Sequence, residues 1–264
     1  MLTKILKKVA TALTPIVVRR PIAVPTPLGF RFVLKPDDPK SLKMASGFYE
    51  REDVRVYKTL KLQPGLILDV GANIGFFSLL FAHTFPQCQV HAFEPNPYSF
   101  GRLLENLKAN PKLDKRISTF DNAMSDREHR VELTTVPGVV GHAWGRVGIP
   151  RRDGMITYDV EAKTVDRLYA GRGLPIRLIK IDVEGYELPV LEGASAVVAE
   201  FRPIIVFEVS LSFLIEQPGV YQRQLEFAEK HGYQAMVLEG AGLVPYKWPH
   251  TRVFNMWFLP NAAP

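Results

Sequence analysis

Cysteine is nearly absent from this chain of 264 residues. The single Cys88 cannot form an internal disulfide, and one thiolate is too few for a cysteine-based zinc site. We therefore expect a reducing compartment, which points to the cytoplasm, and no redox role for this thiol.

Several signals of other protein classes are also missing. No segment approaches the ~20 apolar residues that span a bilayer as a helix. The six histidines show no metal-ligand spacing, and no G-x-S-x-G motif presents a serine nucleophile. These gaps exclude a helical membrane-spanning protein and argue against zinc and serine hydrolases.

Positive charge is scarce outside the N-terminus, although the net charge is +6. Residues 1–20 contain five basic residues and no acidic one, so the rest of the chain is close to neutral. A nearly neutral body does not support a groove that tracks phosphates, so we expect no nucleic-acid partner.

The first residues form a basic amphipathic pattern that Pro15 would end. Apolar residues recur at helical spacing with lysines between them, at Leu2, Ile5, Leu6, Val9, Leu13 and Ile16 and at Lys4, Lys7 and Lys8. Three interpretations stay open: a helix packed on this domain or on a second subunit, peripheral attachment to an anionic membrane, and a cleaved signal peptide. We assign residues 1–45 to this extension and a proline-rich connector, and residues 46–264 to the main domain.

From residue 66 onward, short apolar runs alternate with helical patterns. Strands are predicted at 66–70, 89–93, 117–122, 176–181, 204–207, 233–238 and 253–259, and helices at 74–84, 97–109, 187–198 and 220–231. Two edge strands, 130–134 and 155–161, are expected in the less regular region between them. This alternation predicts an α/β fold with a mainly parallel sheet, covered by helices on both faces, and one antiparallel member near the C-terminus.

A glycine-containing loop follows the first of these strands. In Asp69-Val-Gly-Ala-Asn-Ile-Gly75 the glycines let the backbone approach a ligand, and the next helix offers unpaired N–H groups to an anion. Glu94 ends the second strand, where a Rossmann-like site places the acid that binds ribose hydroxyls. Asp121 and Asn122 end the third strand, beside the expected position of a base. These features predict an adenosine-type site, with capping and turn roles as the alternatives.

Charged residues end the fourth and fifth strands. The segment Lys180-Ile-Asp-Val-Glu-Gly-Tyr-Glu187 closes the fourth strand and Glu208 closes the fifth. In a doubly wound sheet these ends lie beside the first loop, in the crevice where ligands bind. Such charges cost stability unless they are paired or used, so Asp182 and Glu184 are predicted to line a reaction site.

Four segments, taken in order, resemble the FkbM family of S-adenosylmethionine-dependent methyltransferases. They are Asp69-Val-Gly-Ala-Asn-Ile-Gly75, Ala92-Phe-Glu-Pro-Asn-Pro97 with Asn106, Lys180-Ile-Asp-Val-Glu-Gly185 with Glu187, and Leu191-Glu-Gly-Ala194. The resemblance implies a class I methyltransferase fold, which is a doubly wound, Rossmann-like sheet of seven strands in the order 3-2-1-4-5-7-6. It also implies methylation of a hydroxyl on a sugar, glycan, polyketide or related metabolite.

The same resemblance implies cofactor contacts. Asp69, Gly71, Asn73 and Gly75 would hold the methionine part, Glu94 the ribose, and Asn122 and Ala123 the adenine, with Glu50, Ala72, Asn96 and Asp182 as further candidates. Glu50 belongs to Gly47-Phe-Tyr-Glu50, a segment that can either cover the cofactor or begin a helix. Residues before 66 and residues 135–155 match the family poorly, so the acceptor is not predicted.

An alcohol acceptor needs a base or a metal to remove its proton. The candidate bases are Asp182 and Glu184, followed by Glu208 and by His142, whose ordinary pKa of about 6.5 is suitable. Asp182, Glu184 and Glu208 could instead gather Mg²⁺. Two other classes stay open: an N-methyltransferase, which the missing Asn/Asp-Pro-Pro-aromatic motif disfavours, and a cofactor-binding scaffold or partner subunit without catalysis.

Overall fold

A computed structural model describes residues 20–36, 38–135, 145–147, 153–210, 219–240, 242–247 and 253–261. The basic segment 1–19 and His142 lie outside these residues, so the three interpretations of the N-terminus and the histidine base stay predictions. Within the described ranges, no helix is long and apolar enough to cross a bilayer.

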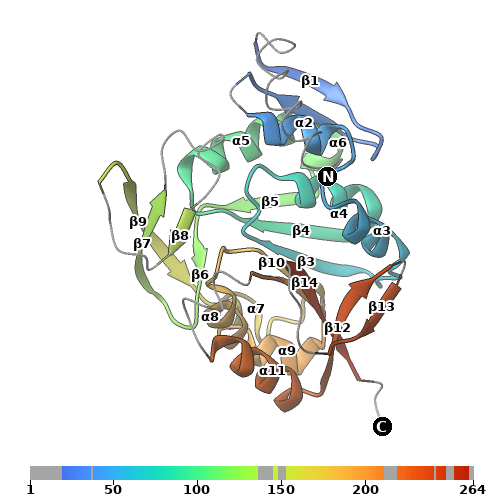
Figure 1. Cartoon of the computed structure of the whole chain (residues 1–264), viewed down its shortest axis with the longest axis vertical. Coiled ribbons are helices and arrows are strands. Elements are labelled where there is room, and N and C mark those ends of the chain that lie inside the picture. Colours follow the sequence, from blue (N-terminus) through green and yellow to red (C-terminus); the bar gives the residue numbers. More distant parts are fainter. Residues whose placement is uncertain are drawn as a thin grey trace.

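An eight-stranded sheet lies at the centre of the molecule (Figure 1). Its strands are β3 (Gly65–Val70), β4 (Cys88–Phe93), β5 (Ile117–Phe120), β10 (Ile176–Ile181), β11 (Ile204–Val209), β12 (Tyr233–Glu239), β13 (Gly242–Pro245) and β14 (Phe254–Pro260). They pair in the order β13-β12-β14-β11-β10-β3-β4-β5. The pairs from β5 to β11 are parallel, whereas β14 runs antiparallel to both of its neighbours.

The strand count corrects the expectation of seven. Without β13, the strands numbered along the chain follow the order 3-2-1-4-5-7-6, which is the order that the resemblance implies. The chain reverses after β12 at Gly240, whose φ of +60° favours glycine. Glu239 then pairs with Gly242, and β13 adds an eighth strand at the sheet edge.

The two expected edge strands form a separate sheet instead. β6 (Ala123–Met124), β7 (His129–Thr135), β8 (Gly145–Val147) and β9 (Ile156–Lys163) pair in the order β6-β9-β7-β8. β7 and β9 pair over their full length, and Val131, Leu133, Val160 and Ala162 form a small apolar core of their own. This second sheet stands over the carboxyl ends of the central strands (Figure 1).

Helices cover both faces of the central sheet, as the alternating pattern predicts. One face carries α3 (Arg51–Thr59), α4 (Phe76–Thr84) and α5 (Pro97–Lys108), and the other carries α7 (Val165–Tyr169), α8 (Glu187–Glu192), α9 (Ser195–Phe201) and α11 (Val220–Lys230). Alternate residues of β3 serve the two cores: Ile67 packs with the first set, and Leu66 and Leu68 with the second.

The helix predicted at 187–198 is two helices, α8 and α9. They are separated at Gly193, where an added Cβ atom would lie 1.9 Å from the carbonyl oxygen of Ser125. This close approach of the backbone to the segment after β6 interrupts the helix.

The described part of the predicted connector packs onto the main domain. β1 (Ile22–Pro25) and β2 (Arg31–Leu34) form a hairpin, followed by α2 (Pro39–Ala45). Asn106 of α5 accepts the Val33 N–H at 2.7 Å and donates to the Ile74 carbonyl at 2.8 Å. Arg102 of α5 pairs with Asp38 at 3.0 Å. The hairpin is therefore tied to the loop after β3 through α5, while the boundary after residue 45 stays a prediction.

Replacing Asp38 by Asn should destabilise the fold. Arg102 and Asp38 are 2% and 5% exposed, and breaking a buried ion pair costs about 3 kcal/mol or more. Without it, the Arg102 guanidinium keeps the bond to the Val33 carbonyl, and its remaining ion-pair partner among the described residues is the half-exposed Glu105, 3.3 Å away. We expect urea denaturation to show an unfolding free energy lower by about 3 kcal/mol.

Lys35→Met is the matched control because it removes a more exposed ion pair to the same helix, at Glu105. Exposed pairs contribute about 1 kcal/mol or less. Equal losses in the two variants would contradict the assignment of the Arg102–Asp38 pair as the anchor of the hairpin.

Candidate functional site

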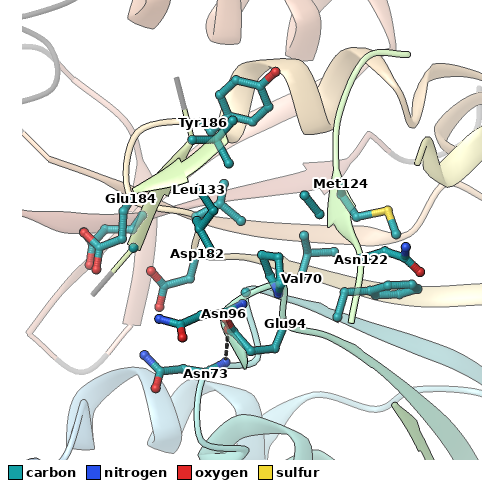
Figure 2. A pocket seen from close by; sticks show the side chains of 18 of the residues that line it. Val70, Asn73, Glu94, Asn96, Asn122, Met124, Leu133, Asp182, Glu184 and Tyr186 are labelled. Atoms are coloured by element: carbon teal, nitrogen blue, oxygen red, sulfur yellow. Dashed lines mark hydrogen bonds between the residues drawn. The ribbon is translucent and has the colours of Figure 1, made fainter. Parts of the chain in front are cut away.

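A pocket of about 770 Å³, open to solvent, lies at the carboxyl ends of the central strands (Figure 2). It is lined by Lys40, Tyr49, Val70, Gly71, Asn73, Phe93, Glu94, Pro95, Asn96, Asn122, Ala123, Met124, Leu133, Gly145, Val147, Asp182, Val183, Glu184, Tyr186 and Glu208. The helices after β3 and β10 cover opposite faces, so the pocket lies at a topological switch point.

The glycine loop after β3 is built by close packing against β10. Gly71 has a φ of +79°, and an added Cβ atom would lie 1.9 Å from the carbonyl oxygen of Asp182. Glycine is therefore required here by the neighbouring backbone as well as by any ligand. The N–H groups of Gly71 and Ala72 both donate to the Phe93 carbonyl at 2.9 Å, which joins this loop to the end of β4.

Only some of the cofactor-binding residues predicted in this loop reach the pocket. Gly71 and Asn73 line it, whereas Asp69, Ala72 and Gly75 lie behind it. Asp69 is fully buried and accepts the Ser78 hydroxyl, and Gly75 caps the N-terminus of α4 against Leu103. Asp69 and Gly75 therefore help to fix the conformation of the loop after β3.

A buried lysine joins the ends of β3 and β10. Lys180 lies opposite Asp69 in the register of the two strands, and its Nζ donates to Asp182 Oδ2 at 3.1 Å. Burial opposes the charge on Lys180, but the carboxylates of Asp182, Asp69 and Glu50 outweigh it and raise the lysine pKa. Burial also opposes ionisation of Asp182, and Lys180 reverses this effect and lowers the Asp182 pKa. Asp182 therefore carries a negative charge at the pocket wall.

Glu94 connects the loops after β3 and β4. Its Oε2 accepts the Asn73 N–H at 2.7 Å and its Oε1 accepts the Asn96 N–H at 2.8 Å; Figure 2 shows the first bond. Burial raises the Glu94 pKa to about 7, although the two backbone bonds act against this shift. Each carboxylate oxygen has a further lone pair that can accept a ligand hydroxyl. The Asn96 side chain caps α5 by accepting the Tyr98 N–H at 3.0 Å.

The third strand end forms the opposite wall. Asn122, Ala123 and Met124 line the pocket there, and the Asn122 amide donates to Glu161 Oε2 at 3.0 Å. Phe93 also lines this wall and stacks on Phe120, with ring centroids 4.8 Å apart. Asp121 is exposed and lies outside the pocket lining, so only Asn122 of that predicted pair faces the site.

Glu184 and Glu208 bring two more carboxylates to the same side as Asp182. Burial raises the Glu208 pKa to about 8, and the charges of Asp182 and Glu184 add to the effect. Glu184 has a φ of +55°, and its carbonyl accepts the Arg146 Nε–H at 2.9 Å. Among the described residues, no three His, Cys, Asp or Glu side chains form a group that could hold a metal ion. The described residues therefore contain no preformed group of ligands for the Mg²⁺ of the alternative mechanism.

Glu187 holds the turn between β10 and α8. Its Oε1 accepts the N–H groups of Val183 at 3.3 Å and Gly185 at 3.0 Å. The side chain is buried, and burial raises its pKa to about 7. The role is thus structural, and it also begins α8 with an acidic residue as predicted.

Two lining residues, Lys40 and Tyr49, were not among the predicted site residues. Lys40 belongs to α2, and Tyr49 precedes α3. Glu50 caps α3 with a φ of +42°, which supports the helix-start interpretation, and it accepts the Tyr49 hydroxyl behind the pocket wall. The sequence signal for Tyr49 was its place in the segment Gly47-Phe-Tyr-Glu50, whereas no motif in the sequence pointed to Lys40.

Comparison with known proteins adds independent findings. The model of the methyltransferase FkbM domain matches residues 69–235. Methyltransferase sdnD of Sordaria araneosa is 32% identical over 154 residues, which are 48% of this chain and 59% of that protein. The 2-O-methyltransferase NoeI of Sinorhizobium fredii is 30% identical over 164 residues, with coverages of 56% and 65%. The chain therefore spans less than two thirds of the length of either relative.

A solved structure titled as methyltransferase FkbM from Methylobacillus flagellatus aligns with a TM-score of 0.49 at 18% identity. The alignment covers 83% of this chain and 54% of that chain.

Raising the pH should destabilise the protein through its buried glutamates. The Glu187 pKa rises from an ordinary 4.5 to about 7 on folding, so the folded state binds this proton more tightly. The resulting stabilisation is fully present below the ordinary pKa and is lost as the pH rises through the folded pKa. Glu94 and Glu208 act in the same direction. In urea denaturation the unfolding free energy should fall between about pH 5 and about pH 8.

Glu187→Gln should reduce this pH dependence, because its amide oxygen can still accept both backbone bonds but carries no titrating proton. Glu229→Gln, at an exposed position of α11, should leave it unchanged. Identical slopes in the wild type and Glu187→Gln would contradict the assignment.

Proposed function

Because the chain belongs to the FkbM methyltransferase family, we propose that it methylates a hydroxyl of a sugar, glycan, polyketide or related metabolite with S-adenosylmethionine. The observation that carries this proposal is that Glu94, Asp182 and Glu208 line the same pocket. A site for adenosine and a site for acid–base chemistry thus share one cavity. The similarity to the 2-O-methyltransferase NoeI supports oxygen as the accepting atom. We also propose a cytoplasmic location.

The residues present fit the cofactor in this pocket. Glu94 offers carboxylate lone pairs for the ribose hydroxyls, and Gly71 brings backbone to the cavity surface without a side chain. Asn122 provides a polar side chain to the part of the pocket that we propose for the adenine, and the buried Phe93 ring adds an apolar lining there. When bound, S-adenosylmethionine would supply a methyl group on a positively charged sulfur. The negative charge of Asp182 favours a cation on this side of the pocket.

Glu208 is the best-placed general base among the described carboxylates. A base works best when its pKa lies near the working pH, and the Glu208 pKa is about 8. Asp182 accepts a proton less readily because Lys180 lowers its pKa. We therefore assign proton removal to Glu208 and orientation of the acceptor hydroxyl to Asp182. The charge of Glu184 helps to raise the Glu208 pKa. Much of the remaining contribution is the alignment of the acceptor oxygen with the methyl carbon.

Glu94→Gln should weaken cofactor binding. A hydrogen bond to a charged group contributes about 1.5–3 kcal/mol, so calorimetry should show an affinity for S-adenosylmethionine lower by about 10- to 100-fold. Glu229→Gln should bind like the wild type, and thermal unfolding of each variant checks its fold. Unchanged affinity in a folded Glu94→Gln protein would remove Glu94 from the cofactor site.

Glu208→Gln should lower acceptor methylation by about 10²- to 10⁴-fold, the usual effect of losing a general base. Labelled S-adenosylmethionine offered with hydroxylated glycans and polyketides identifies an acceptor for this assay. The wild-type rate should rise with pH through about 8 as Glu208 loses its proton, and the variant should lose this dependence. Cofactor affinity should change by less than about twofold, a difference of ~0.4 kcal/mol.

Two results would contradict the proposed role of Glu208 or the proposed activity. Loss of activity with a chelator and its return with Mg²⁺ would favour the metal alternative. Cofactor binding by the wild type without methylation of any acceptor would favour a scaffold role.

A further inference from the structure

Three basic side chains surround two adjacent aromatic residues beside the pocket. The ammonium groups of Lys40 and Lys43 lie 5.5 Å and 5.2 Å from the centroid of the Tyr49 ring. The Arg51 guanidinium lies 5.8 Å from the centroid of the Phe48 ring. Tyr49 and Lys40 line the pocket, and Phe48 is 62% exposed. We call Lys40, Lys43 and Arg51 the basic cluster.

Tyr49 separates this basic cluster from the carboxylates of the site. Its hydroxyl donates to Glu50, and its pKa is raised by burial and then by the charges of Glu50, Asp182 and Glu208. The hydroxyl end of the Tyr49 ring therefore faces the carboxylates. The ammonium groups of Lys40 and Lys43 lie over the ring itself. The pocket thus has a negative region and a positive region on either side of one tyrosine.

Among the described residues that line the pocket, Lys40 is the one with a basic side chain. It makes no ion pair with any residue that the structure describes, in contrast to Lys180, which is paired with Asp182. Its charge is nevertheless close enough to lower the Asp182 pKa, after the larger effects of burial and Lys180. A cation that makes no ion pair with the described residues, at the wall of a partly closed pocket, attracts an anion.

We propose that the acceptor carries an anionic group, a carboxylate or a phosphate, which Lys40 binds at the pocket wall while its hydroxyl lies beside Asp182 and Glu208. This inference rests on the proposed methyltransferase function and narrows its acceptors to acidic sugars and phosphorylated metabolites. The rival partner for Lys40 is the carboxylate of the cofactor itself, and the test separates the two.

The test compares glucose, glucuronate and glucose 6-phosphate as probes of the full-length protein saturated with S-adenosylhomocysteine. Dissociation constants are measured by calorimetry or by ligand-observed NMR. A charge-assisted contact corresponds to a preference of about 10- to 100-fold for an anionic probe over glucose. The glucuronate and glucose 6-phosphate results decide which anion the site prefers.

Lys40→Gln should remove most of this preference, and Lys40→Arg should keep it because the positive charge is retained. Lys58→Gln, at an exposed position of α3 away from the pocket, controls for the loss of one positive charge. Cofactor affinity should stay within about twofold of the wild type in Lys40→Gln.

Equal binding of the three probes to the wild type would overturn the inference. So would a Lys40→Gln protein that keeps the preference, or one that loses cofactor affinity instead. Failure of the proposed function has a different signature, since the wild type would then not bind S-adenosylmethionine or would not methylate any acceptor.

Discussion

The ammonium group of Lys180 holds the site together. It is 3% exposed, it donates to Asp182, and it lies 4.5 Å from the centroid of the Phe77 ring. A buried charge is tolerated only when partners surround it, so Asp69 and Asp182 must stay at the ends of adjacent strands. This requirement brings the loop after β3 against the turn after β10. The contact is so close that Gly71 has no room for a side chain.

The same lysine divides the acids of the pocket into two kinds. Asp182 has Lys180 as its partner, so its pKa is lowered, whereas burial raises the pKa of Glu94 and Glu208. Pairs of acids whose pKa values are moved apart are a common basis of acid–base chemistry. One strand edge therefore presents a fixed negative charge next to carboxylates that can exchange a proton near neutral pH.

A segment far away in the sequence completes the pocket. The family match begins at residue 69, yet Lys40 and Tyr49 line the cavity. The hairpin that precedes them is held by Asn106 and Arg102 of α5, and α5 begins directly after the loop that contains Glu94. The cofactor wall and the proposed acceptor wall are thus connected through one helix.

The sequence by itself determined the parallel strands β3, β4, β5, β10 and β11, the helices α4 and α5, and the positions of Glu94, Asp182 and Glu208 at strand ends beside one pocket. These features depend on apolar periodicity and on residues at strand ends, which neighbouring positions encode. Only the tertiary structure decided the second sheet, the strand β13, the break at Gly193 and the places of Lys40 and Tyr49. The tertiary structure also decided that the pKa of Asp182 is lowered and that of Glu208 is raised. Strand pairing, close backbone contact and burial all depend on residues that are far apart in the chain. The local sequence pattern therefore does not predict these features.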